Sequence, residues 1–481
     1  MLAKAFYEYP LSTPKPGWAE QNPGDWWKAV VSGLRSVVKG VKVSDIAAVG
    51  LSGQMHGLVA LDRNNEVLRP AILWCDQRTV KQCAEITKKI GAERLINLVA
   101  NPALTGFTAG KILWMRENEP ELYKKTAKIL LPKDYIRFKL TGKFATEVSD
   151  ASGTLLLDVK NRKWSETILK ELNISRELLP ECFESEEITA YVDSKASKLT
   201  GLAVSTPVGG GGGDQAASAI GCGIVEKGII SVTLGTSGVV FAFSDKLKRD
   251  KEGRIHTFCH AVKGKWHTMG VMLSAGGSLK WFKDTLCREE ISLAAVKKID
   301  PYEIILKDLE KIRPGSEKLL FLPYLSGERT PYADPYARGT FIGLGLHHNK
   351  KHMARAVLEG ISFGLKDSIE IMRSLKIPVQ QIRVSGGGAK SKFWLQMLAD
   401  IFGQKVISVN LTEGGALGAA LLAGSGTGLY TDLKKICKKL IKTKESFKPN
   451  KKHQLFYKRY YNLYKKSYSN LKDEFKELAD C

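Results

Sequence analysis

The stretch Val208-Gly209-Gly210-Gly211-Gly212-Gly213-Asp214-Gln215-Ala216-Ala217-Ser218 joins an apolar, β-branched run to a segment of small side chains. The run at 204–208 predicts a strand, the glycines predict a turn that can adopt positive φ, and the small residues predict a helix start. Because glycine has no Cβ, another molecule can approach this backbone closely. The pattern places Asp214 near a helix N-terminus, where a carboxylate stays ionised.

Asp214 has two interpretations. An ionised acid in a glycine-walled cleft can act as a general base that takes a proton from a substrate hydroxyl. The alternative is an ordinary strand-to-helix turn in which Asp214 caps the helix. The stretch by itself does not decide between them.

The composition indicates an ordinary globular protein. The chain has 481 residues, 43% of them hydrophobic and 26% charged, which is enough for a large core in two or three domains. No stretch is apolar enough to span a bilayer, and the first residues lack the apolar region of a secretory signal. The eight cysteines form no C-x-x-C pair, so neither a zinc ribbon nor a disulfide framework is predicted. We therefore expect a cytoplasmic protein with no membrane partner.

The formal net charge of +23 raises the question of nucleic-acid binding. The excess comes from lysines that are spread throughout and are densest between Lys434 and Lys476. Within that region apolar residues recur at helical spacing: Phe456, Tyr460, Leu463, Tyr464, Leu471, Phe475 and Leu478. This pattern predicts an amphipathic helix whose apolar residues face the core and whose basic face is solvated. No nucleic-acid-binding motif accompanies it, so we expect no nucleic-acid partner.

Helix and strand patterns alternate along the first half of the chain. The predicted elements are a helix capped by Asn22 with an apolar face from Trp26 to Val38, a buried strand at 46–51, a hairpin at 58–73, helices at 79–89, 111–118 and 133–140, and a short strand at 129–131.

The second half repeats this alternation. The predicted elements are strands at 229–234, 239–243 and 382–385, a helix whose inner face spans 393–401, and a close-packed helix of small residues from 413. Strands that alternate with helices and end in glycines predict an α/β fold, with ligands at the carboxyl ends of the strands. The chain divides most readily between 221 and 228, which predicts domains at 1–224 and 225–481.

Two glycine turns are candidate phosphate or nucleotide sites. Gly235-Thr236-Ser237-Gly238 offers consecutive backbone N–H groups and two hydroxyls, although an ordinary hairpin turn explains the same residues. Gly386-Gly387-Gly388 would let a ribose or adenine lie against the backbone, although glycines also simply terminate strands. The chain has no G-x-x-x-x-G-K-[ST] sequence, which excludes a Walker-type phosphate loop.

Polar residues follow the first predicted strand and the hairpin. In Gln54-Met55-His56-Gly57, His56 could donate to a sugar hydroxyl while Met55 packs on a carbon face, but a single histidine is commonly structural. Asp76 and Arg78 form either a hydroxyl clamp or a structural ion pair. The pairs His256/His260 and His348/His352 have metal-ligand spacing without a third ligand nearby, so we interpret both as structural.

Taken together and in order, these motifs resemble the FGGY family of carbohydrate kinases. The resemblance extends from about Trp18 to Tyr461 and rests on long matching stretches: 50–57, 68–74, 106–114, 325–331, 339–344 and 352–359. Within that family, the tetrad at 54–57 is typical of the members that act on D-xylulose.

The resemblance implies two actin-like, ribonuclease-H-like ATPase domains with a cleft between them. It implies transfer of the γ-phosphoryl group of ATP to O5 of D-xylulose with Mg²⁺, in a reaction that depends on positioning and charge neutralisation. By this resemblance Asp214 is the base, and the sugar contacts are Gln54, Met55, His56 and Gln215. The phosphate and nucleotide contacts are Gly235, Thr236, Gly277, Gly387 and Gly388. The resemblance identifies no metal ligand in this chain.

The sequence departs from the family pattern in three places. It lacks the family's N-terminal Asp-x-Gly-Thr hairpin, and residues 2–16 resemble the segment that the family has after that hairpin. We therefore expect weaker ATPase activity and a less stable first domain than in an upstream-extended form. Cys75 stands where the family usually has asparagine, and the glycine run before Asp214 is longer than usual.

Two other functions are compatible with the sequence. One is a related kinase acting on ribulose, gluconate or glycerol, which the tetrad at 54–57 disfavours. The other is a non-catalytic sugar-binding relative, which the presence of Asp214 disfavours, since a binder needs no base. The sequence leaves a homodimer open.

Overall fold

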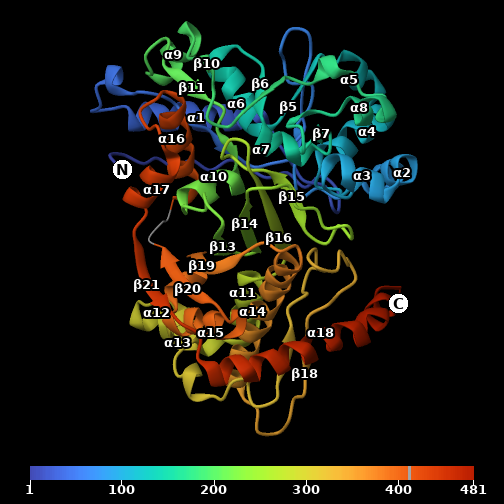
Figure 1. Cartoon of the computed structure of the whole chain (residues 1–481), viewed down its shortest axis with the longest axis vertical. Coiled ribbons are helices and arrows are strands. Elements are labelled where there is room, and N and C mark those ends of the chain that lie inside the picture. The colour runs from blue at the N-terminus through green and yellow to red at the C-terminus, as the bar shows by residue number, and fades with distance from the viewer. Residues whose placement is uncertain (410–412, 481) are drawn as a thin grey trace. The chain divides into compact units, whose positions relative to one another are not determined.

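The computed structural model describes residues 1–409 and 413–480. It divides into two compact units, each assembled from three segments of the chain (Figure 1). Unit 1 comprises Met1–Val225, Ser244–His267 and Glu413–Leu440, and unit 2 comprises Glu226–Phe243, Thr268–Thr412 and Ile441–Cys481. Both units combine helices with strands, as the alternating sequence pattern predicts.

Unit 1 is built from many short elements. Its helices are α1 (Pro23–Val37), α2 (Val80–Ile90), α3 (Ala92–Val99), α4 (Thr108–Asn118), α5 (Pro120–Lys125), α6 (Pro132–Thr141), α7 (Val148–Ala151), α8 (Glu166–Leu172), α9 (Ser194–Thr200), α10 (Asp214–Gly221), α16 (Gly414–Gly426) and α17 (Leu433–Leu440). Its strands are β1 (Glu20–Gln21), β2 (Ser52–Gly53), β3 (Val59–Leu61), β4 (Ala71–Ile72), β5 (Lys128–Leu130), β6 (Ala145–Glu147), β7 (Leu157–Asp158), β8 (Lys163–Trp164), β9 (Glu181–Phe183), β10 (Ile188–Tyr191), β11 (Pro207–Gly209), β12 (Gly212–Gly213) and β15 (His256–Cys259).

Several of these elements lie where the sequence predicts them. Helix α1 begins after Asn22, whose side chain accepts a hydrogen bond from the amide of Gly24, with Pro23 in the first turn. The hairpin at 58–73 is present: Leu61 bridges Val67 across a turn that contains a positive φ at residue 65. The predicted helices α2, α4 and α6 and the strand β5 are confirmed within a few residues, whereas α3 and α5 were not predicted.

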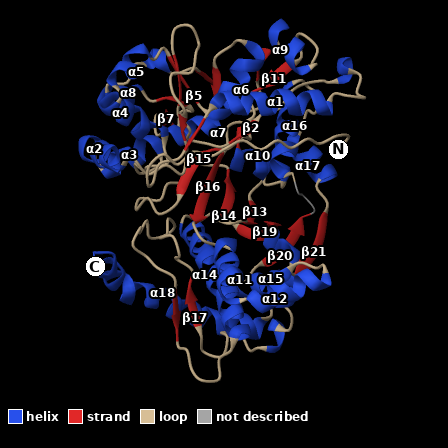
Figure 2. Cartoon of the chain, turned by 180° about the vertical axis from the view of Figure 1, so that it is seen from behind, coloured by secondary structure: helices blue, strands red, loops and turns tan. Residues whose placement is uncertain are grey.

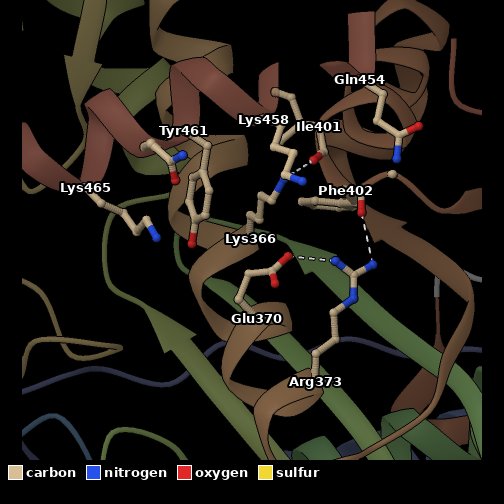
Figure 3. A pocket seen from close by; sticks show the side chains of 11 residues that line it. Lys366, Glu370, Arg373, Ile401, Phe402, Gln454, Lys458, Tyr461 and Lys465 are labelled. Carbon is tan, nitrogen blue, oxygen red and sulfur yellow. Dashed lines mark hydrogen bonds and ion pairs between the residues drawn. The ribbon is translucent and has the colours of Figure 1, made fainter. Parts of the chain in front are cut away.

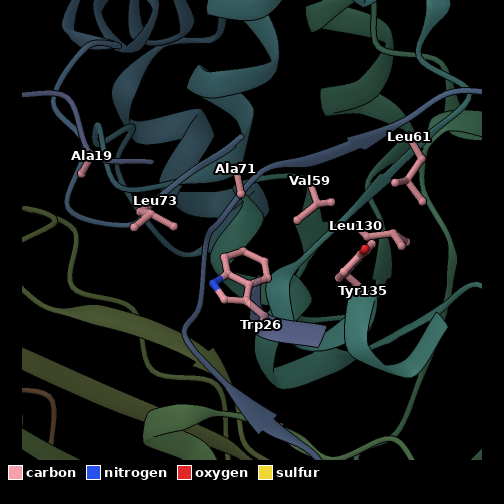
Figure 4. Close-up of a cluster of buried hydrophobic side chains, with 8 residues drawn as sticks. All are labelled: Ala19, Trp26, Val59, Leu61, Ala71, Leu73, Leu130 and Tyr135. Atoms are coloured by element: carbon pink, nitrogen blue, oxygen red, sulfur yellow. The ribbon is translucent and has the colours of Figure 1, made fainter. Parts of the chain in front are cut away.

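One hydrophobic cluster joins strands β3, β4 and β5 to helices α1 and α6 (Figure 4). Its buried members are Ala19, Trp26, Val59, Leu61, Ala71, Leu73, Leu130 and Tyr135. Trp26 of α1 meets Tyr135 of α6 in an edge-to-face contact, with ring centroids 6.5 Å apart. Burial of an aromatic side chain contributes roughly 1.5–3 kcal/mol, so Trp26 is a main anchor of α1.

The predicted buried strand at 46–51 is wrong in both extent and burial. Only β2 is a strand there, preceded by a single parallel bridge between Val49 and Val208, and residues 46–51 are half-buried or exposed. The amide of Gly209 donates to Val49 and that of Gly212 donates to the carbonyl of Leu51. Between them the chain leaves the extended conformation at Gly211, where φ is +72°, so the ladder cannot run continuously.

Helices α10 and α16 approach each other at backbone distance. A Cβ added to Gly418 of α16 would lie 1.8 Å from the carbonyl oxygen of Ala217 in α10. A Cβ added to Gly221 of α10 would lie 2.0 Å from the carbonyl oxygen of Gly414. The small residues that predict a close-packed helix are thus required by this contact, which fixes the helix that begins with Asp214.

Unit 2 contains longer strands and helices. Its strands are β13 (Gly228–Leu234), β14 (Gly238–Ser244), β16 (Trp266–Met272), β17 (Leu320–Leu322), β18 (Thr340–Ile342), β19 (Val379–Gly386), β20 (Lys405–Val409) and β21 (Thr443–Phe447). Its helices are α11 (Gly276–Leu286), α12 (Arg288–Lys297), α13 (Pro301–Ile305), α14 (Lys350–Ser374), α15 (Lys392–Phe402) and α18 (Lys451–Asp480).

The main sheet of unit 2 follows the strand order β16-β14-β13-β19-β20-β21. Strands β13, β19 and β20 are parallel to one another, and β13 and β14 form an antiparallel hairpin around residues 235–237, as predicted. Helices α11, α14 and α15 lie together beside this sheet (Figure 2). Parallel pairing brings the carboxyl ends of β13 and β19 to one edge.

Helix α18 is amphipathic as predicted, but some of the residues on its buried face differ from those predicted. Tyr460, Tyr464 and Phe475 are buried, whereas the predicted core residues Phe456, Leu463 and Leu478 are 40%, 53% and 69% exposed. The buried face is completed by three tyrosines that lie at helical spacing from these: Tyr457, Tyr461 and Tyr468. Tyrosine is favoured there because each hydroxyl has a buried hydrogen-bond partner or a polar neighbour at its tip. Within residues 1–409 and 413–480, no helix is both long and apolar enough to cross a membrane.

Candidate active site

Asp214 is the first residue of α10 and directly follows the glycine strand β12. The N-cap is Gly213, so the alternative in which Asp214 serves as the cap is wrong. The carboxylate is half-buried, and its Oδ2 accepts a hydrogen bond from Nε2 of Gln215 at 3.0 Å. Burial raises the pKa of Asp214, against the lowering effect of hydrogen bonds from Gln215 and from the backbone. A carboxylate whose pKa lies closer to neutrality is a better proton acceptor.

The parallel pairing of β2 with β12 brings predicted sugar-side residues to Asp214. Gly53 pairs with Gly213, so Gln54 and Asp214 leave the two strands at the same end. Met55 is 4% exposed, and a Cβ added to Gly213 would lie 2.8 Å from its Cγ. Met55 therefore packs on the backbone that immediately precedes Asp214.

His56 is held in a left-handed backbone conformation, with φ of +68°. Its Nδ1 lies 2.6 Å from the carbonyl oxygen of Gly153, and its ring meets Phe107 edge to face at 4.9 Å. Its carbonyl oxygen accepts hydrogen bonds from Thr108 Oγ1 at 3.0 Å and Lys111 Nζ at 2.9 Å. These contacts fix the turn at 54–57, because a non-glycine residue holds positive φ only where its surroundings enforce it.

Lys111 supports the turn at 54–57, a role that the sequence did not reveal. Its ammonium group is fully buried and also donates to the carbonyl oxygen of Gly106 at 2.7 Å. Burial lowers the pKa of Lys111 to about 7, although the nearby carboxylate of Asp76 opposes this shift. The turn that carries His56 thus depends on a lysine that titrates near neutral pH.

A buried ionic cluster, also not predicted, lies close enough to Asp214 for the charge of Asp214 to act on one of its carboxylates, Asp150. Lys133 Nζ lies 2.6 Å from Asp134 Oδ1, 3.5 Å from Asp150 Oδ2 and 3.7 Å from Glu147 Oε1, and all four side chains are fully buried. These carboxylates raise the pKa of Lys133 despite its burial. Burial raises the pKa of Asp150 well above its usual value, and the charges of Asp134, Glu147 and Asp214 raise it further against Lys133.

This cluster connects to the backbone at Asp214 through Ser149. Glu147 accepts hydrogen bonds from the amides of Ser149 and Asp150 at 2.8 and 2.9 Å and from the Ser149 hydroxyl at 2.9 Å. The amide of Gly213 in turn donates to Ser149 Oγ at 3.2 Å. In the sequence, this ionic cluster is visible only as charged residues in and beside the segments that form α6 and α7.

The remaining polar candidates of unit 1 are structural. Asp76 and Arg78 form a buried ion pair at 2.7 Å, and the amide of Ala19 also donates to Asp76 at 2.6 Å. This arrangement favours the ion-pair interpretation over a hydroxyl clamp. His256 lies on strand β15 and contacts Asn101, and within the described ranges no group of three His, Cys, Asp or Glu residues could hold a metal ion.

The nucleotide-side candidates of unit 2 lie at the carboxyl ends of β13 and β19. Gly235 and Thr236 form an exposed turn that is held by the start of α11: the amides of Gly276 and Gly277 each donate at 2.9 Å to the carbonyl oxygens of Gly235 and Thr236. A Cβ added to Gly277 would lie 3.1 Å from the Thr236 oxygen. Glycine at 277 therefore allows the helix to support this turn closely.

Gly387 and Gly388 follow β19, whose last residue pairs with Leu234. A Cβ added to Gly387 would meet no atom within 4 Å, so the backbone there borders open space. A Cβ added to Gly388 would lie 2.6 Å from Leu234 Cδ1 and 2.8 Å from the Trp394 ring. Packing thus explains glycine at 388 but not at 387, where no protein atom fills the space.

Two family models match this chain. The N-terminal domain of the FGGY family of carbohydrate kinases matches residues 1–221, and the C-terminal domain matches residues 230–427. The chain is 43% identical over 475 residues to the xylulose kinase of Bacillus subtilis (strain 168), covering 98% of this chain and 93% of that relative. It is 33% identical over 430 residues to the gluconokinase of the same strain, covering 89% and 83%.

The fold agrees with these sequence matches. The crystal structure of a "xyloylose kinase" from Brucella ovis has a TM-score of 0.87 at 34% identity and covers 96% of this chain and 93% of that chain. Both halves of the sequence and the fold thus match one group of ATP-dependent sugar kinases. The chain belongs to the FGGY family of carbohydrate kinases.

Proposed function

We propose that this chain transfers the γ-phosphoryl group of ATP to O5 of D-xylulose, giving D-xylulose 5-phosphate and ADP. The observation that carries the proposal is the parallel pairing of β2 with β12. There Met55 packs on Gly213, the residue before Asp214, and Gln54 follows Gly53, with its side-chain amide donating to Gln21 at 2.9 Å. A thioether packed on the residue before a carboxylate offers an apolar surface for the carbon chain of a ketose near an acceptor for its hydroxyl groups. The 43% identity to a xylulose kinase supports this choice of sugar.

Asp214 is the proposed general base. Its carboxylate takes the proton of the attacking hydroxyl as the new O–P bond forms, while Gln215 holds the carboxylate through Oδ2. Gln54, Met55 and His56 position the sugar, and the hydrogen bond at Nδ1 fixes the plane of the His56 ring.

Gly235 and Thr236 are proposed to hold the transferred phosphate, and Gly277 and Gly387 to border the nucleotide. The exposed turn and the open space beside Gly387 fit a phosphate chain and a ribose that lie against backbone. We assign Gly388 to the same edge, in a packing role. On these residues we assign sugar binding to the predicted domain 1–224 and nucleotide binding to the predicted domain 225–481, of which the segments 244–267 and 413–440 belong to unit 1.

Mg²⁺ is the proposed cofactor. The described residues provide no cluster of three ligand side chains, which fits an ion held mainly by the nucleotide phosphates and water. Bound in this way, the ion would neutralise the phosphate charges. We place the reaction in the cytoplasm, where ATP is available.

The test is an ADP-release assay with Mg²⁺-ATP and D-xylulose, D-ribulose, gluconate or glycerol in turn. We expect turnover with D-xylulose and a loss of about three orders of magnitude or more in the Asp214→Asn variant, with sugar binding measured by calorimetry nearly unchanged. Turnover confined to gluconate would favour the second candidate, which the 33% identity to a gluconokinase supports. A rate in Asp214→Asn close to the original would refute the assignment of the base.

A further inference from the structure

A polar pocket lies in unit 2, bordered by helices α14 and α18 and the end of α15 (Figure 3). Its volume is about 410 Å³, and none of the residues assigned above to the nucleotide lines it. Four cationic side chains line it together with a single carboxylate: Lys366, Arg373, Lys458, Lys465 and Glu370. We call it the α14–α18 pocket.

Lys366 is the buried cation of this pocket, with 8% of its surface exposed. Its Nζ donates to the carbonyl oxygen of Ile401 at 2.6 Å and lies 4.8 Å from the centre of the Tyr461 ring. An ammonium group has three N–H donors, so this carbonyl uses only part of its capacity. Burial lowers the pKa of Lys366 to about 8. The positive charges of Arg373 and Lys465 act in the same direction, and the negative charges of Glu370 and Asp367 oppose the shift.

The carboxylates near Lys366 bind other groups, and Glu370 offsets one of the pocket cations, Arg373. Glu370 accepts from Arg373 Nη1 at 2.6 Å, and the Tyr461 hydroxyl donates to Asp367. Burial also raises the pKa of Asp367 to about 7, which reduces its negative charge near neutral pH. The pocket therefore keeps an excess of positive charge around the buried ammonium group.

The cations converge from two helices. Lys458 and Lys465 are seven residues apart on α18, about two helical turns, so both lie on the face toward α14. Figure 3 shows Lys366 between Tyr461 and Phe402, with Lys458 and Lys465 at the pocket wall. Like charges held this close repel, and an anion bound among them would relieve the repulsion.

We propose that the α14–α18 pocket binds the phosphate group of a small phosphorylated molecule or inorganic phosphate. With Glu370 paired to Arg373, three lysines of the pocket lining remain, which favours a multiply charged anion over a chloride ion or a single carboxylate. The amide side chain of Gln454, which lies over Gly403 at the pocket, adds a neutral donor that suits a phosphate oxygen. This site is independent of the proposed reaction.

The test uses calorimetry on the full chain with saturating D-xylulose and a non-hydrolysable ATP analogue, so that other phosphate sites are occupied. The probes are inorganic phosphate and glycerol 3-phosphate in chloride buffer. We expect one saturable site, weakened about tenfold or more in Lys458→Gln/Lys465→Gln. The matched control Lys466→Gln/Lys472→Gln changes two exposed lysines of the same helix outside the pocket and should bind within about twofold of the original.

The two probes separate the two sources of phosphate. Binding of glycerol 3-phosphate about tenfold tighter than inorganic phosphate identifies a phosphorylated molecule, and equal affinities identify free phosphate. A second readout is proton uptake at pH 8, seen as a buffer-dependent enthalpy, which should disappear in Lys366→Met. Absence of saturable binding of either probe, or equal weakening in the pocket and control variants, would overturn the proposal.

Discussion

Because α10 and α16 are in contact at backbone distance, we predict that one added methyl group between them destabilises the protein. In Gly418→Ala the new Cβ would lie 1.8 Å from the carbonyl oxygen of Ala217, whereas real Cβ atoms stay at least 3.0 Å away. The obstacle is backbone, so the helices must separate by about 1.2 Å or more, since no side chain can rotate away. Overpacking of this kind costs roughly 1–3 kcal/mol, and it exceeds the gain of about 1 kcal/mol that alanine brings to a helix.

The same separation should move the base. Asp214 begins α10, and a misplacement of about 1 Å in a catalytic group can cost on the order of 100-fold in rate. We therefore expect Gly418→Ala to lower kcat by roughly 10- to 100-fold, with a smaller change in the KM for ATP. Urea denaturation and the ADP-release assay measure the two effects.

Gly415→Ala is the matched control on the same helix. Its Cβ would lie 3.4 Å from Ser218 Oγ, an ordinary contact, so the change should be neutral or stabilise the protein by up to about 1 kcal/mol. Equal stability and activity of the two variants would show that the close approach of α10 and α16 does not exist in the folded protein.

The other predictions concern a buried lysine and the glycine edge of unit 2. Folding lowers the pKa of Lys111 from 10.5 to about 7, so between pH 7 and 10.5 the unfolded chain binds more protons than the folded chain. The free energy of unfolding should therefore rise with pH in this range, by up to about 1.4 kcal/mol per pH unit. Urea titrations at pH 7 and 9 should show this rise reduced in Lys111→Met, and an unchanged slope would contradict the burial of that charge. Gly387→Ala should keep the original stability and raise the KM for ATP, whereas Gly388→Ala should lower the melting temperature through its contact with Leu234. Similar melting temperatures for both alanine variants would argue against this distinction.

Much of the chain's local structure could be predicted because its signals are local. Asn22 and Pro23 start α1, the glycines before Asp214 end a strand, and small residues make α16 compact. Each of these depends on the conformational preference of a residue or on a hydrogen bond within one turn. The order of such motifs was enough to identify the family.

The buried faces and the support of the site could not be predicted in this way. Apolar spacing predicted an amphipathic α18, but Phe456 and Leu463 are exposed because the packing of α14, α15 and β17 decides which residues are covered. The apolar run at 46–51 resembled a buried strand, yet its parallel partner turns away at Gly211. The sequence pattern gives the periodicity of a helix or strand, but it does not show which of its residues a neighbouring element covers.

Residue type and spacing along the chain are enough to give the order of strands, glycine turns and helices, and to single out Asp214. The folded arrangement alone shows that Lys111 supports the turn of His56. It alone also shows that Lys133 pairs with Glu147, which Ser149 links to the amide before Asp214. Charges so far apart in sequence carry no local signal. Their attraction becomes strong only when folding removes water from around all of them together, and it then offsets the cost of burying each charge.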